Sequence, residues 1–300
     1  MTTAMAPARE TDNPLGPLRV PGASGGLIEV FRRRYLLKLL VRKELRVRYQ
    51  GSVIGLGWSY VQPLVRFAMY YYIIGLIMTH RTPGRALLIF SGLIMVQFAS
   101  NCLGQGSKAI LKNKSLVRKI NLPREMFPVS NVAVSLYHML PMYVILLIGV
   151  LINGWHPDGR AVLAIFLGLA IAIVWGLATA LVLSATNVFF RDTQNVADVI
   201  NVVLRWVVPM IYPFGLIMHH AQGHAFLYQV YLLNPLTSAV LLADRAFWIP
   251  SMANPAKLAA ANMPSHLFER SFLMLLAGLV ALGLAQLLFS RLEGRFAEQL

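Results

Sequence analysis

Charge, and acidic charge above all, is scarce in this 300-residue chain: only 13% of its residues are Asp, Glu, Lys or Arg. A soluble domain usually carries about 25%. Lys and Arg number 27 against 12 Asp and Glu, which gives a formal net charge of +15, while 57% of the residues are hydrophobic. Because the basic residues flank long apolar runs, anionic lipid headgroups account for them better than nucleic acid does. We therefore expect an integral membrane protein that binds no nucleic acid.

Motifs for catalysis and cofactor binding are also missing. The dipeptide Gly-Lys never occurs, so there is no P-loop, and neither H-E-x-x-H nor G-x-S-x-G is present. The single cysteine, Cys102, cannot form an intrachain disulfide. His220 and His224 are separated by Gly223, which disfavours a helix, and no third ligand is near in sequence. We expect no catalytic residue, no metal site and no cofactor bound by this chain.

Six apolar runs are long enough to cross about 30 Å of hydrocarbon at roughly 20 residues each. They cover about 56–78, 86–107, 127–152, 161–189, 199–218 and 268–289. The predicted fold is therefore all-α, with a six-span domain over 51–292. Residues 1–26 are polar, rich in Pro and Gly and without an apolar core, so we expect a flexible cytoplasmic tail rather than a signal peptide. Residues 293–300 form a second short tail.

The segment 226–249 is apolar enough to suggest a seventh span. However, Asn234-Pro235 lies near its centre and Asp244-Arg245 follows, and both a proline and two charges disfavour a continuous membrane helix. We expect two short re-entrant helices that enter the membrane from outside and return.

Residues 27–50 are predicted to form an amphipathic helix at the membrane surface. Arg34, Lys38, Arg42 and Arg46 recur every four residues and make one basic row, with Arg48 beside it. Such a row suits lipid phosphates, although an ordinary solvated basic face is the alternative. The glycines at 51, 55 and 57 then turn the chain into the first span.

Loop charge predicts the orientation. The segment 32–48 holds eight Lys or Arg and the loop 108–124 holds six, whereas 80–85 holds two and 153–160 holds one. Because basic loops stay in the cytoplasm, both termini are predicted to be cytoplasmic in the inner membrane.

The basic loop after the second run carries the sharper signal. Ser115 is placed to cap a short helix through Arg118 and Lys119, Pro123 stops it, and Arg124-Glu125 leads back to the membrane. A short charged helix of this kind fits a groove on a partner. The alternative is a simple basic turn.

Two arginines interrupt the spans, Arg66 about ten residues into the first and Arg205 in the fifth. An arginine facing lipid at this depth is costly, so each is expected to face protein, water or an anionic substrate, unless it snorkels to the interface or pairs with a backbone carbonyl. Aromatic residues able to line a path for sugars are Tyr60, Tyr70, Tyr71, Trp175, Trp206 and Tyr212. Core packing is the alternative for each of them.

Four motifs in order resemble the membrane subunits of ABC exporters for lipid-linked polysaccharides. They are K-E-L-R-V-R-Y-x-x-S-V-I-G-x-x-W-x-x-x-Q-P from Lys43, L-V-x-K-x-x-x-P-R-E from Leu116, N-V-F-F-R-D from Asn187, and Asn234-Pro235. The resemblance covers about 30–292. Within the group the chain is most similar to the actinobacterial exporter of the cell-wall galactan precursor.

The resemblance implies a homodimer above two ATPase subunits, which bind ATP and Mg²⁺. It implies that 27–49 is an interface helix and that 226–248 forms the re-entrant pair. It also implies a coupling helix that docks on the ATPase, comprising Ser115, Leu116, Val117, Arg118, Lys119 and Pro123, with Arg124 and Glu125 after it. Arg66 is outside the family pattern.

We therefore predict a permease subunit that exports a polysaccharide of the O-antigen or galactan type on a polyprenyl diphosphate carrier. One alternative is an ABC exporter of a drug or small lipid. Another is a membrane-bound glycosyltransferase or assembly scaffold, for which Asp192 and Asp198 are available but form no metal motif.

Overall fold

The computed structural model describes residues 25–74, 76, 82–119, 122–220 and 224–299, so the predicted tail before residue 25 lies outside it. Every regular element among these residues is helical. The α-helices are α1 (Gly26–Arg32), α2 (Arg34–Tyr49), α3 (Trp58–Met69), α5 (Arg85–Gly106), α6 (Ala109–Lys112), α7 (Lys114–Lys119), α8 (Met126–Ile152), α9 (Gly159–Phe189), α10 (Thr193–Val207), α11 (Phe214–His220), α12 (Ala225–Leu232), α13 (Pro235–Ala243), α14 (Pro255–Asn262), α15 (Leu267–Glu293) and α16 (Phe296–Gln299).

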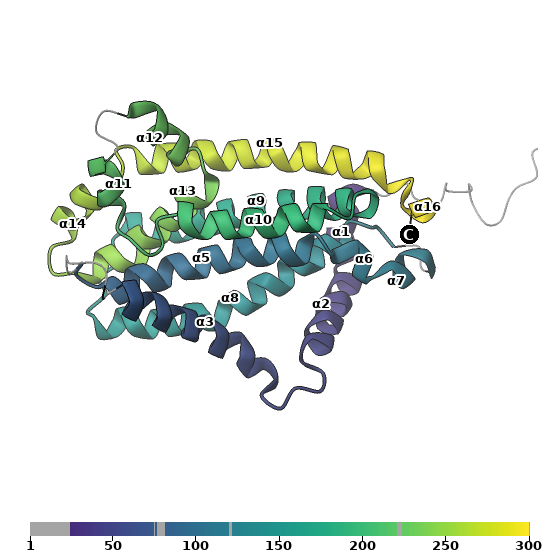
Figure 1. Cartoon of the computed structure of the whole chain (residues 1–300), viewed down its shortest axis with the longest axis horizontal. Coiled ribbons are helices and arrows are strands. Elements are labelled where there is room, and N and C mark those ends of the chain that lie inside the picture. The colour runs from purple at the N-terminus through teal and green to yellow at the C-terminus, as the bar shows by residue number, and fades with distance from the viewer. Residues whose placement is uncertain (1–24, 75, 77–81, 120–121, 221–223, 300) are drawn as a thin grey trace, which may run out of the picture.

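The long helices lie side by side, and α2 runs across their direction (Figure 1). Helices α6, α7 and α16 gather at one end of the bundle, and α11, α12 and α14 lie at the other. The basic loop and the last helix thus share an end, which we call the α7 end.

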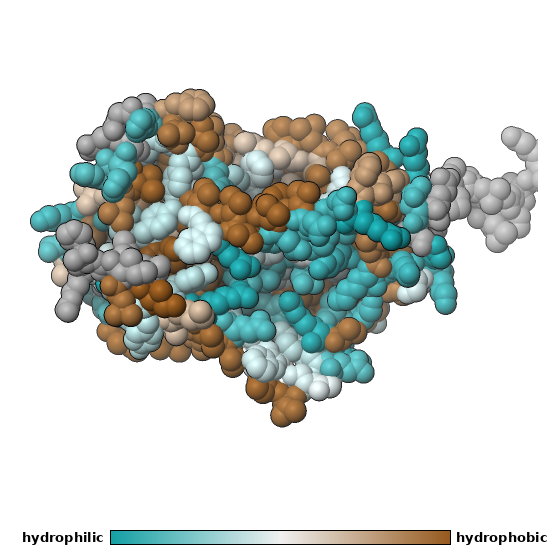
Figure 2. Space-filling model, viewed as in Figure 1, coloured by the Kyte–Doolittle hydropathy of each residue, from teal (hydrophilic) through white to brown (hydrophobic). Residues whose placement is uncertain are grey.

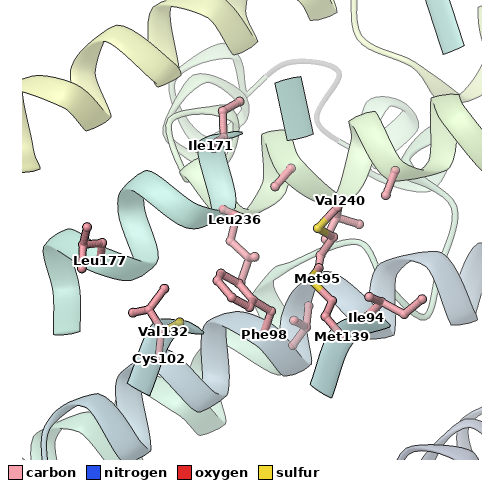
Figure 3. Close-up of a cluster of buried hydrophobic side chains, with 14 of the residues drawn as sticks. Ile94, Met95, Phe98, Cys102, Val132, Met139, Ile171, Leu177, Leu236 and Val240 are labelled. Carbon is pink, nitrogen blue, oxygen red and sulfur yellow. The ribbon is translucent and has the colours of Figure 1, made fainter. Parts of the chain in front are cut away.

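The core surrounds α5, the most enclosed of the long helices. Figure 3 shows Phe98 and Met95 of α5 among side chains from α8, α9 and α13, including Val132, Ile171 and Leu236. All of these lie in one buried hydrophobic cluster. In lipid the hydrophobic effect does not hold helices together, so this close packing supplies much of their association.

Small residues let the helices approach closely. A Cβ on Gly106 of α5 would lie 2.8 Å from the Cβ of Ala180 on α9, and one on Gly278 of α15 would lie 2.6 Å from Nε1 of Trp175 on α9. Such contacts leave no room for a side chain. Glycine at these two positions therefore fixes how α9 packs against its neighbours on both sides.

Four helices are long and apolar enough to cross a membrane, and they confirm the second, third, fourth and sixth predicted runs: α5, α8, α9 and α15. The outer surface of α15 is apolar, with Leu273, Val280 and Leu284 more than 60% exposed. Figure 2 shows brown side chains along the edge where α15 lies. These helices make the chain an integral membrane protein.

The first and fifth predicted runs do not form single long helices in the described residues. The first consists of α3 and a π-helical turn, Tyr70–Ile74, and residues 75 and 77–81 lie outside the described part. The fifth, α10, has 15 residues, about 22 Å at 1.5 Å each, and ends at Val207 rather than near 218. The chain bends at Val208, whose φ and ψ are −86° and 140°, because the backbone leaves the helical region there.

The predicted break at Asn234-Pro235 is present. The segments Phe226–Leu232 and Pro235–Ser251 meet at a bend of 73°. The Asn234 side chain accepts a hydrogen bond from the amide of Leu236 and so begins α13. Beyond α13, Ser91 Oγ donates to Asp244 Oδ1 at 2.6 Å, and Arg245 Nη2 lies 2.5 Å from Asp158 Oδ2. Polar partners within the protein thus accommodate the two charges that disfavoured a span.

The amphipathic segment is not one helix from 27 to 50. It begins at Gly26 and breaks at Arg33, where φ is −94° and ψ is 40°, leaving the short α1 before α2. The Arg33 side chain turns back to Glu29, with Nε 2.6 Å from Oε1. This local ion pair accompanies a bend that the spacing of the basic row did not indicate.

Candidate transport path and coupling surface

Helix α2 carries the predicted headgroup residues on its open face. Arg34, Lys38, Arg42, Arg46 and Arg48 are all exposed, whereas Leu40 is buried. The inner face packs on α8. The sequence pattern therefore identified the sidedness of this helix correctly, while Leu39 and Val47 remain exposed apolar residues on it. Contact between the basic row and lipid phosphates stays a prediction.

Helix α2 is bonded to the loop that follows α5. Lys112 Nζ of α6 lies 2.6 Å from Glu44 Oε2 of α2, and Lys43 Nζ lies 2.5 Å from Asn113 Oδ1. Glu44 is 9% exposed, whereas the Lys112 side chain is 47% exposed, so the carboxylate is enclosed between the helices and the ammonium group is open to the surface. Neither Glu44 nor Asn113 was singled out from the sequence. The available signal was a lone carboxylate within a run of basic residues.

The predicted short helix is α7. It begins at Lys114, directly after Asn113, whose carbonyl accepts from the amides of Leu116 and Val117. Ser115 therefore lies inside the first turn and is not the cap, which corrects the prediction. Ser115, Arg118 and Lys119 are exposed, whereas Leu116 and Val117 are partly buried against the core. The apolar side anchors α7 and its cationic side is open.

The residues that lead from this loop into α8, residues 123–125, make contacts within the same chain. Pro123 and Glu125 are buried. Gln286 Nε2 of α15 donates to Glu125 Oε1 at 2.8 Å, and Arg124 donates to the carbonyl of Glu293 and lies 5.7 Å from the ring centre of Phe296. The structure thus separates the eight predicted docking residues into three that are exposed on α7, two on α7 that pack against the core, and residues 123–125, of which Arg124 and Glu125 are bonded to α15.

A polar cavity of about 390 Å³ lies between α2, α3, α5 and α8. It contains Arg66, one of the predicted path residues, whose Nη1 donates to Gln97 Oε1 of α5. Arg205 of α10 is not among the residues that line this cavity. Of the two arginines that the sequence placed in separate spans, the structure therefore places Arg66 in the cavity lining and Arg205 outside it. Hydrophilic side chains also gather on the face where α2, α3 and α10 lie (Figure 2).

The six aromatic residues do not form one continuous lining in this chain. Tyr71 is 37% and Trp206 63% exposed on the surface, while Tyr60 and Tyr70 are partly buried on the same segment as Arg66. Tyr212 donates to the carbonyl of Trp206 at 3.1 Å and lies 3.3 Å from the hydroxyl of Tyr231. It joins the end of α10 to the bent segment.

Trp175 is placed differently from the other aromatic residues. Its Nε1 donates to the carbonyl of Met274 on α15 at 3.0 Å, above Gly278. It also borders an apolar hollow of about 450 Å³ next to α10, α13 and α15. Its contacts are those of a helix-packing residue, the alternative left open by the sequence.

No group of three or more His, Cys, Asp or Glu side chains within the described ranges is arranged to hold a metal ion. The polar residues converge instead on a cavity and on one end of the bundle. Together with the membrane helices, this arrangement defines a helical membrane protein with a polar cavity inside it and exposed cationic side chains at the α7 end.

The chain belongs to the family described as the ABC-2 type transporter, whose model matches residues 35–243. It is 28% identical over 239 residues to the O-antigen export system permease protein RfbA of Myxococcus xanthus, covering 78% of this chain and 90% of the relative. It is 25% and 23% identical over 268 and 263 residues to two proteins of that name from Klebsiella pneumoniae, each covering 88% of this chain and 94% of the relative.

Proposed function

We propose that this chain is the permease subunit of an ATP-driven ABC transporter that exports an O-antigen-type polysaccharide, carried on a polyprenyl diphosphate, across the cytoplasmic membrane. The observation that carries the proposal is the similarity to O-antigen export permeases along nearly the whole chain, within a family whose model spans α2 to α13. The narrower galactan assignment is a further proposal within that class.

ATP binding is assigned to a partner. The chain has no P-loop, so ATP and Mg²⁺ belong in an ABC ATPase subunit. The exposed Ser115, Arg118 and Lys119 of α7 form the surface that such a subunit would contact. Because Lys112 and Lys43 bond the neighbouring α6 and α2, a push on α7 would reach α2 and, through residues 50–57, the first helix of the path.

A second copy of the chain is expected opposite the path. Val199, Val203 and Trp206 lie at i, i+4 and i+7 on α10 and are 63%, 51% and 63% exposed. Such an apolar stripe fits another helix or lipid. In a homodimer, α3 and α10 of the two copies would enclose the conduit, with both termini and α7 in the cytoplasm and 226–249 re-entrant from outside.

The experiment is depletion of the chain in its own cell, followed by identification of the lipid-linked material that accumulates in the inner leaflet. Accumulation of a polyprenyl diphosphate carrying a finished glycan supports the proposal. Accumulation of a small lipid or drug supports the alternative ABC exporter, and a shortened glycan would indicate an assembly role. Co-purification with an ATPase that has a P-loop tests the partner.

A further inference from the structure

The cavity beside α2 is built by matching faces of three helices. From α5 it takes Ile94, Gln97 and Asn101, at i, i+3 and i+7, and from α8 it takes Ser135, His138 and Met142 at the same spacing. Helix α3 contributes Ser59, Gln62 and Arg66, again at i, i+3 and i+7. This is the spacing of one side of a helix. One side of each of these three helices therefore faces the cavity, and the end of α2 completes its lining.

Two arginines, at different positions along the cavity, make its lining positively charged. Arg48 lies at the end of α2, near the mouth, and Arg66 lies two turns inside α3. Within the described part of the chain, no Asp or Glu lines the cavity, and neither arginine is in an ion pair with a carboxylate. An arginine inside a membrane protein usually has an anionic or carbonyl partner.

Neutral groups in the cavity already orient Arg66. Its Nη1 donates to Gln97 Oε1, and Gln97 Nε2 in turn donates to Asn101 Oδ1 at 3.0 Å. The amide of Gln97 is thus fixed with its oxygen toward the guanidinium. A guanidinium has five N–H donors, so one bond to Gln97 leaves others for a ligand.

Hydroxyl groups line the stretch between the two arginines. Ser59 Oγ lies 3.1 Å from His138 Nδ1 and in contact with the Tyr49 hydroxyl, and Ser52 lines the cavity near the mouth. Hydroxyls rotate to donate, and phosphoryl oxygens accept several short bonds from such donors and from arginine. The volume of about 390 Å³ falls within the roughly 300–1,000 Å³ of small-ligand sites.

We propose that this cavity binds the diphosphate group of the lipid carrier, with Arg66 as its inner cation and Arg48 as its outer one. The site lies beside the α2–α3 turn, where a lipid moving along the basic face of α2 would reach the path. This proposal rests on the proposed function. It adds a defined position at which the carrier is held before the glycan follows.

The test measures binding to the purified complex of permease and ATPase in detergent. The probe is farnesyl diphosphate, a short polyprenyl diphosphate, with farnesol, inorganic pyrophosphate and phosphatidylglycerol as comparisons. We expect farnesyl diphosphate to bind, pyrophosphate to compete with it, and farnesol not to compete. Arg66→Gln should weaken binding about tenfold or more, because charged hydrogen bonds are lost, and Arg66→Lys should weaken it less. Arg160→Gln, an exposed arginine at the start of α9, is the matched control.

Arg48→Gln is the second variant, because this exposed residue can be changed without disturbing the core. It should weaken binding several-fold. Binding equal to wild type in both Arg66→Gln and Arg48→Gln overturns the proposal, as does farnesol competing as well as the diphosphate. Equal, Arg66-dependent binding of phosphatidylglycerol would also overturn it, by showing a general lipid-headgroup site. Binding is measured without transport, so the two proposals can fail separately. If depletion of the chain stops glycan export but the purified complex does not bind farnesyl diphosphate, the proposed function stands and the binding site is refuted.

Discussion

Lys112 Nζ lies 2.6 Å from Glu44 Oε2, and this ion pair joins α6 to α2 across 68 residues of sequence. Asn113 reinforces it by accepting from Lys43 Nζ at 2.5 Å. The two most basic segments of the chain are thus joined by two polar contacts, one of them to the buried carboxylate of Glu44. The segment that precedes the first span and the loop that carries α7 form a single unit.

Removing the carboxylate should weaken that unit. Glu44→Ala leaves Lys112 without its partner, but the Lys112 side chain is 47% exposed and water can solvate it, so we expect the free energy of unfolding to fall by about 1 kcal/mol. We also expect less export per hydrolysed ATP, because Glu44→Ala removes one of the two polar links between the α6–α7 segment and α2 and leaves only the bond from Lys43 to Asn113. Thermal unfolding and export per hydrolysed ATP are the measurements.

The matched control for this variant is Glu269→Ala. Glu269 lies 3.0 Å from His266 on the surface, with both side chains more than 60% exposed, and pairs of this kind contribute about 0–1 kcal/mol. Equal loss of stability and coupling in the two variants would contradict a special role for Glu44.

Reversing the charges on α7 tests the docking surface. Arg118→Glu combined with Lys119→Glu should abolish co-purification with the ATPase while leaving the permease folded, because both side chains are exposed. The control is Arg160→Glu with Lys257→Glu, which makes the same charge change on exposed residues of α9 and α14. Assembly that survives the α7 reversal would remove the docking claim.

The side chain of Asp158, at the start of α9, accepts hydrogen bonds whose strength should depend on pH. Its carboxylate accepts from Arg245 and from the amide of Ala161 at 2.7 Å, and the hydrogen bond from Arg245 holds the pKa of Asp158 below its ordinary value of 3.8. A lowered pKa stabilises the folded protein above that ordinary value, and this stabilisation is lost as the pH falls through the folded pKa.

We therefore expect the thermal midpoint of the wild type to fall more steeply below pH 3.8 than that of Asp158→Asn. At pH 7 the variant should be less stable by about 1 kcal/mol or less, because the Asp158 side chain is 53% exposed. Thermal unfolding from pH 7 to pH 3 gives both quantities. Parallel curves for the two proteins would show that the Asp158–Arg245 contact has no such role.

Trp175 and Trp206, both predicted from the sequence as path residues, should differ in how much they contribute to stability. Trp175→Ala removes a ring and a hydrogen bond between α9 and α15, so we expect a loss of about 3 kcal/mol in stability. Trp206 is 63% exposed in the single chain, so Trp206→Ala should change the stability of that chain, measured apart from its assembly, by about 0.5 kcal/mol or less. The comparison uses unfolding midpoints of the purified variants.

Export assays of the same variants distinguish residues that line the conduit from residues that only pack the helices together. If Trp206 and Tyr71 line the conduit, alanine at either position should lower export by folded protein, whereas Trp175→Ala should lower it only through loss of protein. Export rates are normalised to the amount of folded permease. Unchanged export in Trp206→Ala and Tyr71→Ala would count against an aromatic path.

Local patterns predicted most of the elements well. The runs that became α5, α8, α9 and α15 are long and apolar, and their length alone sets the span. The break at Asn234-Pro235 follows from the missing amide of proline and from the cap that Asn234 provides. The basic row on α2 follows from its four-residue spacing. Each of these depends on residues that are near one another in sequence.

What the sequence by itself determined is therefore the membrane class, the long spans, the sidedness of α2 and the absence of a P-loop. The tertiary structure decided which residues share a site. Only packing shows that Glu44 meets Lys112, that Arg66 meets Gln97, that Glu125 is buried and that Trp175 joins α9 to α15. The physical reason is that helix spacing fixes the face on which a residue lies, whereas its partner depends on contacts between helices far apart in the chain.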